Sequence, residues 1–209
     1  MNYTEAIAYL EEVASFGIHP GLERITALLE ELGNPQHTYK TIHVTGTNGK
    51  GSVSTYITYG LYMSGLRVGT FTSPHLQSYT ERMRVNTAYI TEEAFADLIE
   101  RVSHAVKAIM DRGVEAPTQF EILTAAAFLF FQDQEVDYAV IEVGLGGLLD
   151  STNVITPEVA VITNVTIDHQ AYCGDTVEEI ARHKAGIIKK GVPLVTAAQG
   201  GALDVIKET

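Results

Sequence analysis

Apolar residues recur along this chain at two different spacings, and segments of the two kinds alternate. The helical spacing predicts helices over residues 2–16, 22–32, 52–64, 91–112, 118–133 and 176–190. Short runs of apolar and β-branched residues predict strands over residues 41–45, 67–72, 138–143, 159–164 and 192–196. Two of these runs, 138–143 and 159–164, lack polar alternation, which is typical of parallel strands covered on both faces.

Strands that alternate with helices indicate an α/β fold, here a doubly wound, mostly parallel sheet with helices on both faces. No repeat, low-complexity segment or linker interrupts the pattern, so we expect residues 1–209 to form one domain. Ligands of such sheets bind beyond the carboxyl ends of the strands. The chemistry is therefore expected just after Thr45, Phe71, Val143 and Ile162.

A glycine-rich segment directly follows the first predicted strand: Gly46-Thr47-Asn48-Gly49-Lys50-Gly51-Ser52. Between a strand and a helix, such glycines let successive N–H groups surround phosphate oxygens, and the helix N-terminus adds its positive dipole end. Lys50 would supply charge to the outer phosphates, and Ser52 would contact a magnesium ion or a phosphate. Gly51 separates Lys50 from Ser52, and this spacing excludes the ordinary GTPase and kinase classes.

The chain is strongly acidic, with 26 Asp and Glu residues against 14 Lys and Arg residues and a formal net charge of -12. Such a surface repels nucleic acid, so no nucleic-acid partner is expected, and an anionic substrate must be recruited by local cations or metal ions. The single cysteine excludes an internal disulfide. No apolar stretch is long enough to span a membrane and no signal peptide is recognisable, so we expect a cytoplasmic protein without a membrane partner.

The loop sequence TGTNGKGS resembles that of the folylpolyglutamate and dihydrofolate synthases and is similar to that of the muramyl-peptide ligases. Other segments follow in the order and spacing of the same family. They are His43-Val44-Thr45, Thr72-Ser73-Pro74-His75-Leu76, Glu81-Arg82-Met83-Arg84-Val85-Asn86, Phe120-Glu121, Glu142-Val143-Gly144-Leu145-Gly146-Gly147, Asp150-Ser151-Thr152-Asn153, Asp168-His169 and Lys184-Ala185-Gly186-Ile187-Ile188-Lys189. The resemblance implies the P-loop NTPase-like central domain of a Mur ligase.

The resemblance also implies a reaction. ATP phosphorylates the γ-carboxylate of a folate, and the amine of L-glutamate then displaces phosphate; some members join glutamate to dihydropteroate instead. ATP and two Mg²⁺ ions are the implied cofactors, with Thr47, Asn48, Gly49, Lys50, Gly51 and Ser52 around the nucleotide. Family members are longer and carry a second, C-terminal domain. We therefore expect an N-terminal ATP-binding part, monomeric and inactive in ligation without the missing C-terminal domain.

Four residues are implied as metal ligands. Glu142 ends a buried strand, where an isolated carboxylate is costly unless it pairs with a cation, and the resemblance makes it a magnesium ligand. Ser73 resembles a ligand near the γ-phosphate, although a serine before Pro74 can equally form a turn. His169 resembles a ligand of the second magnesium ion, which generally prefers oxygen. Lys184 would serve that ion if carbamylated by carbon dioxide, or would belong to a solvated helix face.

Lys50, Lys184 and His169 are thus the implied catalytic residues. Arg82 is a candidate for binding folate or glutamate carboxylates, with a solvent-facing arginine as the alternative, and Asp150 and Asn153 either shape the site or approach the pterin.

Leu148 and Gln119 depart from the family pattern, which has arginine and an aromatic residue at these positions in many members. The first departure disfavours dihydrofolate synthase activity. A bifunctional dihydrofolate and folylpolyglutamate synthase and a non-catalytic nucleotide-binding fragment stay as alternatives, and a muramyl-peptide ligase is disfavoured.

Overall fold

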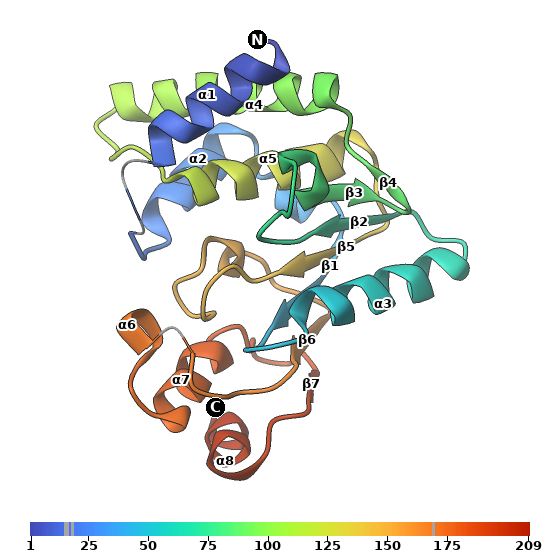
Figure 1. Ribbon diagram of the computed structural model, residues 1–209, viewed down its shortest axis with the longest axis vertical. Helices are drawn as coiled ribbons and strands as arrows, with labels where there is room; N and C mark the ends of the chain where they lie inside the picture. The colour runs from blue at the N-terminus through green and yellow to red at the C-terminus, as the bar shows by residue number, and fades with distance from the viewer. Residues whose placement is uncertain (15–16, 18, 169) are drawn as a thin grey trace.

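A single mixed sheet forms the centre of the molecule (Figure 1). The computed structural model describes residues 1–14, 17, 19–168 and 170–209, and within these ranges the sheet has seven strands in the order β4-β3-β2-β5-β1-β6-β7. The strands are β1 (Lys40–Thr45), β2 (Val68–Phe71), β3 (Met83–Val85), β4 (Ala88–Tyr89), β5 (Tyr138–Glu142), β6 (Val159–Ile162) and β7 (Leu194–Thr196). The five neighbouring strands β2, β5, β1, β6 and β7 pair in parallel. This confirms the predicted mostly parallel sheet.

The hairpin of β3 and β4 is an addition that the sequence pattern did not predict. β3 pairs antiparallel with both β2 and β4, and Asn86 at its turn has a φ of 55°. The two strands have three and two residues, which is too short to produce a recognisable alternation of apolar and polar positions. The hairpin extends the sheet beyond β2 and leaves the parallel order of the other strands unchanged.

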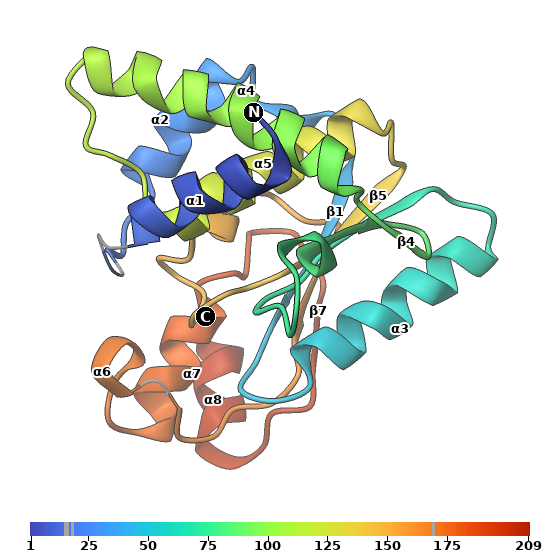
Figure 2. The ribbon, with the colours of Figure 1, turned by 45° about the horizontal axis from the view of Figure 1, so that its top comes forward.

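Helices cover both faces of the sheet, as predicted, and two of them, over residues 170–173 and 200–208, were not predicted. The helices are α1 (Tyr3–Ala14), α2 (Glu23–Glu31), α3 (Lys50–Met63), α4 (Glu92–Asp111), α5 (Gln119–Asp133), α6 (Gln170–Cys173), α7 (Val177–Ala185) and α8 (Gly200–Glu208), with short 3-10 helices η1 (Pro35–His37), η2 (Tyr79–Arg82) and η3 (Ser151–Val154). Helix α3 lies on one face, and the others form two groups on the opposite side (Figure 2). Among the described residues, none of these helices has the length and apolarity needed to cross a membrane.

The two faces of the sheet have different apolar neighbours because side chains alternate along a strand. Val44 of β1 and Val140 of β5 belong to a cluster with Val53 and Ile57 of α3. The opposite face is divided: one cluster joins β2 and β5 to α1, α2, α4 and α5, and a smaller one joins β6 to α7 and α8. The space between these two helix groups is where a ligand can enter.

Helix α7 is shorter than the helix predicted over 176–190. It begins after Thr176, whose side chain accepts a hydrogen bond from the Glu179 N–H in a capping box, and it ends at Ala185. The next residue, Gly186, lies against a turn, since an ideal Cβ at Gly186 would be 2.5 Å from the Cα of Leu148. The end of the helix is therefore set by a close tertiary contact, which the helical spacing of apolar residues does not reveal.

Candidate active site

The glycine-rich segment forms a loop between the end of β1 and the start of α3. Gly46 has a φ of +147° and an ideal Cβ there would lie 1.8 Å from Thr163 Oγ1, so any side chain at this position would displace Thr163. Gly49 has a φ of +80°, immediately before the first turn of α3. Lys50 Nζ donates to the carbonyl oxygens of Gly46 at 3.0 Å and Thr47 at 3.2 Å. The lysine ammonium thus lies over the loop at a helix N-terminus, an arrangement suited to phosphate.

Residues after β6 hold this loop, although they were not predicted to be site residues. Asn164 accepts a hydrogen bond from the Asn48 N–H through Oδ1 at 3.0 Å and donates through Nδ2 to the Asn48 carbonyl at 3.1 Å. Thr163 Oγ1 donates to the same carbonyl at 2.7 Å. Two polar residues directly after a buried strand were the available signal, and they lie at the carboxyl end of β6 where chemistry was expected.

Glu142 ends β5 and points toward the phosphate loop. It is 4% exposed, and its Oε2 is 3.7 Å from the ideal Cβ position of Gly51. Burial raises the pKa of Glu142, against the opposite effects of the Ser73 N–H and the charge of Lys50. Ser73 N donates to Glu142 Oε2 at 3.2 Å, so the structure brings these two predicted metal ligands together.

This donor set fits a magnesium ion. Mg²⁺ is typically held by one or two carboxylates together with water and substrate phosphates. A buried carboxylate beside a serine and a phosphate loop provides the protein part of such a site. In the described part of the chain no group of three His, Cys, Asp or Glu side chains is arranged to hold a metal ion.

Lys184 on α7 is almost completely buried, with 2% of its surface exposed. Burial lowers the pKa of Lys184 from its ordinary value to about 8, and the charge of Lys50 adds to this shift, while Cys173 and Asp168 oppose it. The alternative of a solvated helix face is therefore wrong for this lysine. His169, the other predicted ligand of the second magnesium ion, lies outside the described residues.

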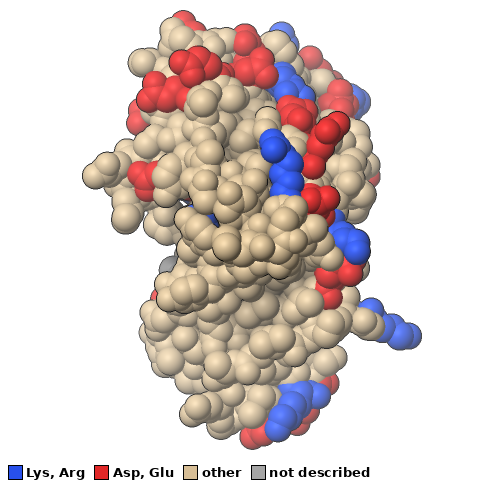
Figure 3. Space-filling model, turned by 90° about the vertical axis from the view of Figure 1, so that its right-hand side faces the viewer, with Lys and Arg blue, Asp and Glu red and all other residues tan. Residues whose placement is uncertain are grey.

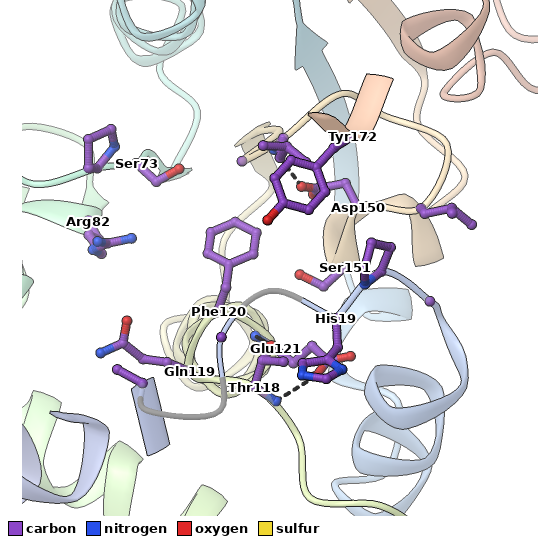
Figure 4. Close-up of a pocket in the computed structure, with 18 of the residues that line it drawn as sticks. His19, Ser73, Arg82, Thr118, Gln119, Phe120, Glu121, Asp150, Ser151 and Tyr172 are labelled. Carbon is purple, nitrogen blue, oxygen red and sulfur yellow. Dashed lines mark hydrogen bonds between the residues drawn. The ribbon is translucent and has the colours of Figure 1, made fainter. Parts of the chain in front are cut away.

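A cavity of about 440 Å³ opens between the two helix groups (Figure 4). Its wall is made by the end of α1, Ser73 and Pro74, Arg82, the first turn of α5, Tyr172 of α6 and His183 of α7, together with Gly17, His19, Pro20, Gly21, Gly144, Leu145, Leu149, Asp150 and Ser151. Phe120 lies in the middle of the labelled side chains, between Gln119 and Tyr172. Gly144 makes room for this ring, because an ideal Cβ there would lie 2.4 Å from Phe120 Cζ.

Arg82 lines the cavity and is fixed by its neighbours. Its Nε donates to His75 Nδ1 at 2.8 Å, and its guanidinium carbon lies 5.6 Å from the ring centroid of Tyr79. Burial lowers the pKa of Arg82, but the guanidinium still keeps its charge at any ordinary pH. The alternative of a solvent-facing loop arginine is wrong, because the side chain is half-buried in the cavity wall.

Glu121 had no predicted role, and it is a buried carboxylate of the cavity. Its Oε2 accepts hydrogen bonds from the Thr118 N–H at 2.6 Å and from Arg24 Nε at 3.1 Å. Its Oε1 is buried and has no hydrogen-bond partner among the described residues. A capping box and an ion pair account for one oxygen, and the other is a buried acceptor without a partner among the described residues.

Asp150 and Asn153 hold the turn that follows Glu142. Asp150 Oδ2 accepts from the Leu145 N–H at 2.8 Å, and burial raises the pKa of this carboxyl. Asn153 Nδ2 donates to the carbonyl oxygens of Leu148 and Gly186, both at 3.0 Å. The geometry supports the view that they shape the site, and their contact with a substrate stays a prediction.

On the face shown in Figure 3, acidic side chains are unevenly distributed. Acidic side chains crowd the upper end of the molecule, where α1 and α4 lie, while a broad area on the α3 side is uncharged (Figure 3). Lys50 of the loop and Arg82 of the cavity wall place cations locally where an anionic substrate needs them.

Comparison with known proteins agrees with this arrangement. The Mur ligase middle domain matches residues 44–198. The chain is 44% identical over 207 residues to the dihydrofolate synthase/folylpolyglutamate synthase of Bacillus subtilis, covering 98% of this chain and 48% of that protein. It is 46% identical over 200 residues to the folylpolyglutamate synthase of Lacticaseibacillus casei, covering 94% and 46%.

An FPGS–AMPPCP–folate complex superimposes with a TM-score of 0.93 and 44% identity, covering 100% of this chain and 51% of that one. The chain spans about half the length of the curated relatives it matches. It belongs to the Mur ligase middle-domain family, where the relatives it matches are folylpolyglutamate and dihydrofolate synthases.

Proposed function

We propose that this chain is the ATP-binding part of a ligase that adds L-glutamate to the γ-carboxylate of a folate through an acyl phosphate. The relatives named above support this reaction, and a solved relative is a complex with AMPPCP and folate. Because the chain spans about half their length, ligation is proposed for a protein that carries it at that full length.

The observation that carries the proposal is the position of Ser73. On one side its N–H donates to Glu142, beside the phosphate loop, and on the other side Ser73 lines the cavity with Arg82. The nucleotide site and the acceptor cavity therefore adjoin at one residue. A transferred phosphoryl group and an acceptor carboxylate can meet there without either substrate crossing the sheet.

The residues have distinct proposed roles. The loop N–H groups and Lys50 hold the outer phosphates, and Arg82 holds a carboxylate of the folate. Glu142 and Ser73 would hold a magnesium ion, which would neutralise charge on the phosphates. An oxygen of the γ-carboxylate bonds to the γ-phosphorus as ADP leaves; the glutamate amine then bonds to the acyl carbon, and phosphate and a proton leave.

Lys184 is proposed to carry a carbamate. Its neutral amine, favoured by a pKa of about 8, would bond to the carbon of CO₂ with loss of a proton, which converts a buried cation into an anionic oxygen ligand. Together with His169 it would serve a second magnesium ion.

With ¹³C-bicarbonate, we expect a carbamate carbon signal in the NMR spectrum of the wild-type chain. The spectrum of the Lys184→Met variant should lack this signal. Equal spectra from the two proteins would reject the modification.

Glutamylation is the direct test of the reaction. A protein containing this chain at the full length of its relatives is incubated with ATP, magnesium, glutamate and tetrahydrofolate, and the products are weighed. Products heavier by successive glutamate units, absent with Lys50→Ala, are expected. Parallel assays with dihydropteroate test the bifunctional alternative, which the name of the Bacillus subtilis relative supports. Nucleotide binding without any glutamylation would favour a non-catalytic module.

Nucleotide and folate are the proposed small-molecule ligands, with a further domain completing the site. A monomeric state and a cytoplasmic location stay predictions.

A further inference from the structure

His43 is a buried histidine that the proposed reaction does not use. It lies on β1, three residues before the phosphate loop, and is 0% exposed. Its side chain points away from α3, because Ile42 and Val44 occupy the α3 face of the same strand. The imidazole therefore faces the turn that carries the cavity wall, on the side of η3.

A chain of hydrogen bonds starts at this imidazole. His43 Nε2 lies 2.8 Å from Thr152 Oγ1, and the Thr152 hydroxyl donates to Asp150 Oδ1. Asp150 Oδ1 also accepts from the Thr152 N–H at 3.0 Å, and Oδ2 accepts from the Leu145 N–H at 2.8 Å. Residues from β1, η3 and the turn after Glu142 are thus joined through three side chains.

The direction of these bonds fixes the proton on the ring. A hydroxyl has one proton, and the Thr152 proton is donated to the Asp150 carboxylate, so the Thr152 oxygen accepts from His43. The imidazole then carries its proton on Nε2, and Nδ1 is bare. In agreement, Nδ1 is buried and has no hydrogen-bond partner in the described part of the chain.

The turn held in this way is part of the acceptor cavity. Leu145, Leu149, Asp150 and Ser151 line it, and a second bond from β1 reaches the same turn, where Thr45 Oγ1 donates to the Gly146 carbonyl at 2.6 Å. One strand therefore supports both halves of the site: its end continues into the phosphate loop, and its side chains hold the cavity wall.

We propose that His43 is a positioning residue for the acceptor cavity: by donating from Nε2 through Thr152 to Asp150, it holds the turn of residues 143–150 at a set distance from the phosphate loop. This inference rests on the proposed function, because it assigns the cavity to the folate acceptor. It predicts that loss of the relay weakens acceptor binding and leaves nucleotide binding unchanged.

A buried histidine can also be a simple filler of the core, and paired variants separate the two roles. His43→Leu fills the space without a donor, whereas His43→Gln places an amide N–H near the position of Nε2. We expect His43→Leu to raise the dissociation constant of folate for the 209-residue chain about tenfold, the loss of one buried hydrogen bond. His43→Gln should restore most of the affinity, and MgATP affinity should change less than about twofold in both.

A second set of variants tests the relay if His43→Leu fails to fold. Thr152→Val removes the hydroxyl and keeps the shape of the side chain, and it should weaken folate binding as His43→Leu does. Because both changes break the same chain, the double variant should bind folate no more weakly than either single variant. Additive losses would show that the two residues act independently and would overturn the proposal.

Two readouts do not depend on folate. Long-range ¹H–¹⁵N spectra should show His43 protonated on Nε2 at pH 7, and amides of residues 143–150 should lose hydrogen-exchange protection in His43→Leu but keep it in His43→Gln. If wild type bound no folate, the assignment of the cavity to a folate would fail, while exchange would still decide whether His43 positions the turn. Equal loss of protection in both variants, or a proton on Nδ1, would overturn the relay.

Discussion

At the scale of single residues, Lys50 has the clearest consequence for binding. Its ammonium group lies over the phosphate loop and donates to two of the loop's own carbonyl oxygens. A cation in this place can turn from carbonyl oxygens to phosphate oxygens with a small movement of a flexible side chain. Affinity for nucleotide should therefore depend strongly on this one side chain.

We expect Lys50→Ala to weaken MgATP binding to the chain by about 10- to 100-fold, the range for one charge-assisted contact. Isothermal titration measures the dissociation constant. Lys107→Ala, an exposed lysine on α4, removes the same charge from a distant surface and should bind as wild type does. Equal weakening by both substitutions would mean that net charge, and not the loop contact, determines affinity.

His43 gives a second residue-scale prediction, on pH. Burial lowers the pKa of His43 from 6.5 to about 3, and the charge of Lys189 adds to the shift, while Asp150 faces it through Thr152. Because the unfolded chain takes up this proton and the folded one does not, stability is fully present above pH 6.5 and falls as pH drops toward 3.

Between pH 7 and 4.5, wild type should lose roughly 2 to 3 kcal/mol of unfolding free energy relative to His43→Gln. Urea unfolding of both proteins at both pH values measures this loss. The contributions of other titrating groups cancel because the two proteins share them. Parallel loss in both proteins would show that His43 is protonated in the folded state.

At the scale of elements, two glycines in neighbouring segments should respond in opposite ways to the same substitution. Gly46 has a φ of +147° and lies against Thr163, whereas Gly60 lies inside α3 with open space around its Cβ position. Gly46→Ala should lower the unfolding free energy by about 2–4 kcal/mol through strain and a clash. Gly60→Ala should raise it by about 0.5–1 kcal/mol, because alanine favours the helix. Chemical denaturation measures both, and destabilisation by Gly60→Ala would mean that the surface of α3 is covered.

The elements also show what the sequence could predict. The long helices and buried strands were predicted to within a few residues because apolar spacing and threonine caps are local signals, as at Thr91 and Thr118. The β3–β4 hairpin and the end of α7 depend on tertiary contacts, such as Gly186 against Leu148, and were missed or misplaced. In the site, the loop and Glu142 were recognisable from their positions at strand ends. Glu121 and Asn164 were not, because their partners are distant in sequence.

At the scale of the whole molecule, the two helix groups belong to separate apolar clusters of unequal size. Segments with fewer buried contacts open at lower free energy. Amides of α8 should therefore exchange with solvent faster than those of α5 in native-state hydrogen exchange.

MgATP should slow hydrogen exchange in α7, which carries Lys184, and leave exchange on the exposed side of α4 unchanged. Uniform slowing throughout the chain would instead indicate that the molecule opens only as one unit.

The position of Glu142 at the end of β5 has a consequence for how this sequence can change over time. Val140 and Glu142 share the α3 face of the sheet, while Ala139 and Ile141 face the other helices. The carboxylate reaches the phosphate loop only because side chains alternate between the two faces and Glu142 is two residues after Val140. Loss or gain of one residue within β5 would rotate Glu142 to the opposite face and bury it against helices. Descendants of this chain can exchange one β-branched residue for another along β5, but insertions and deletions should be confined to the turns on either side of it.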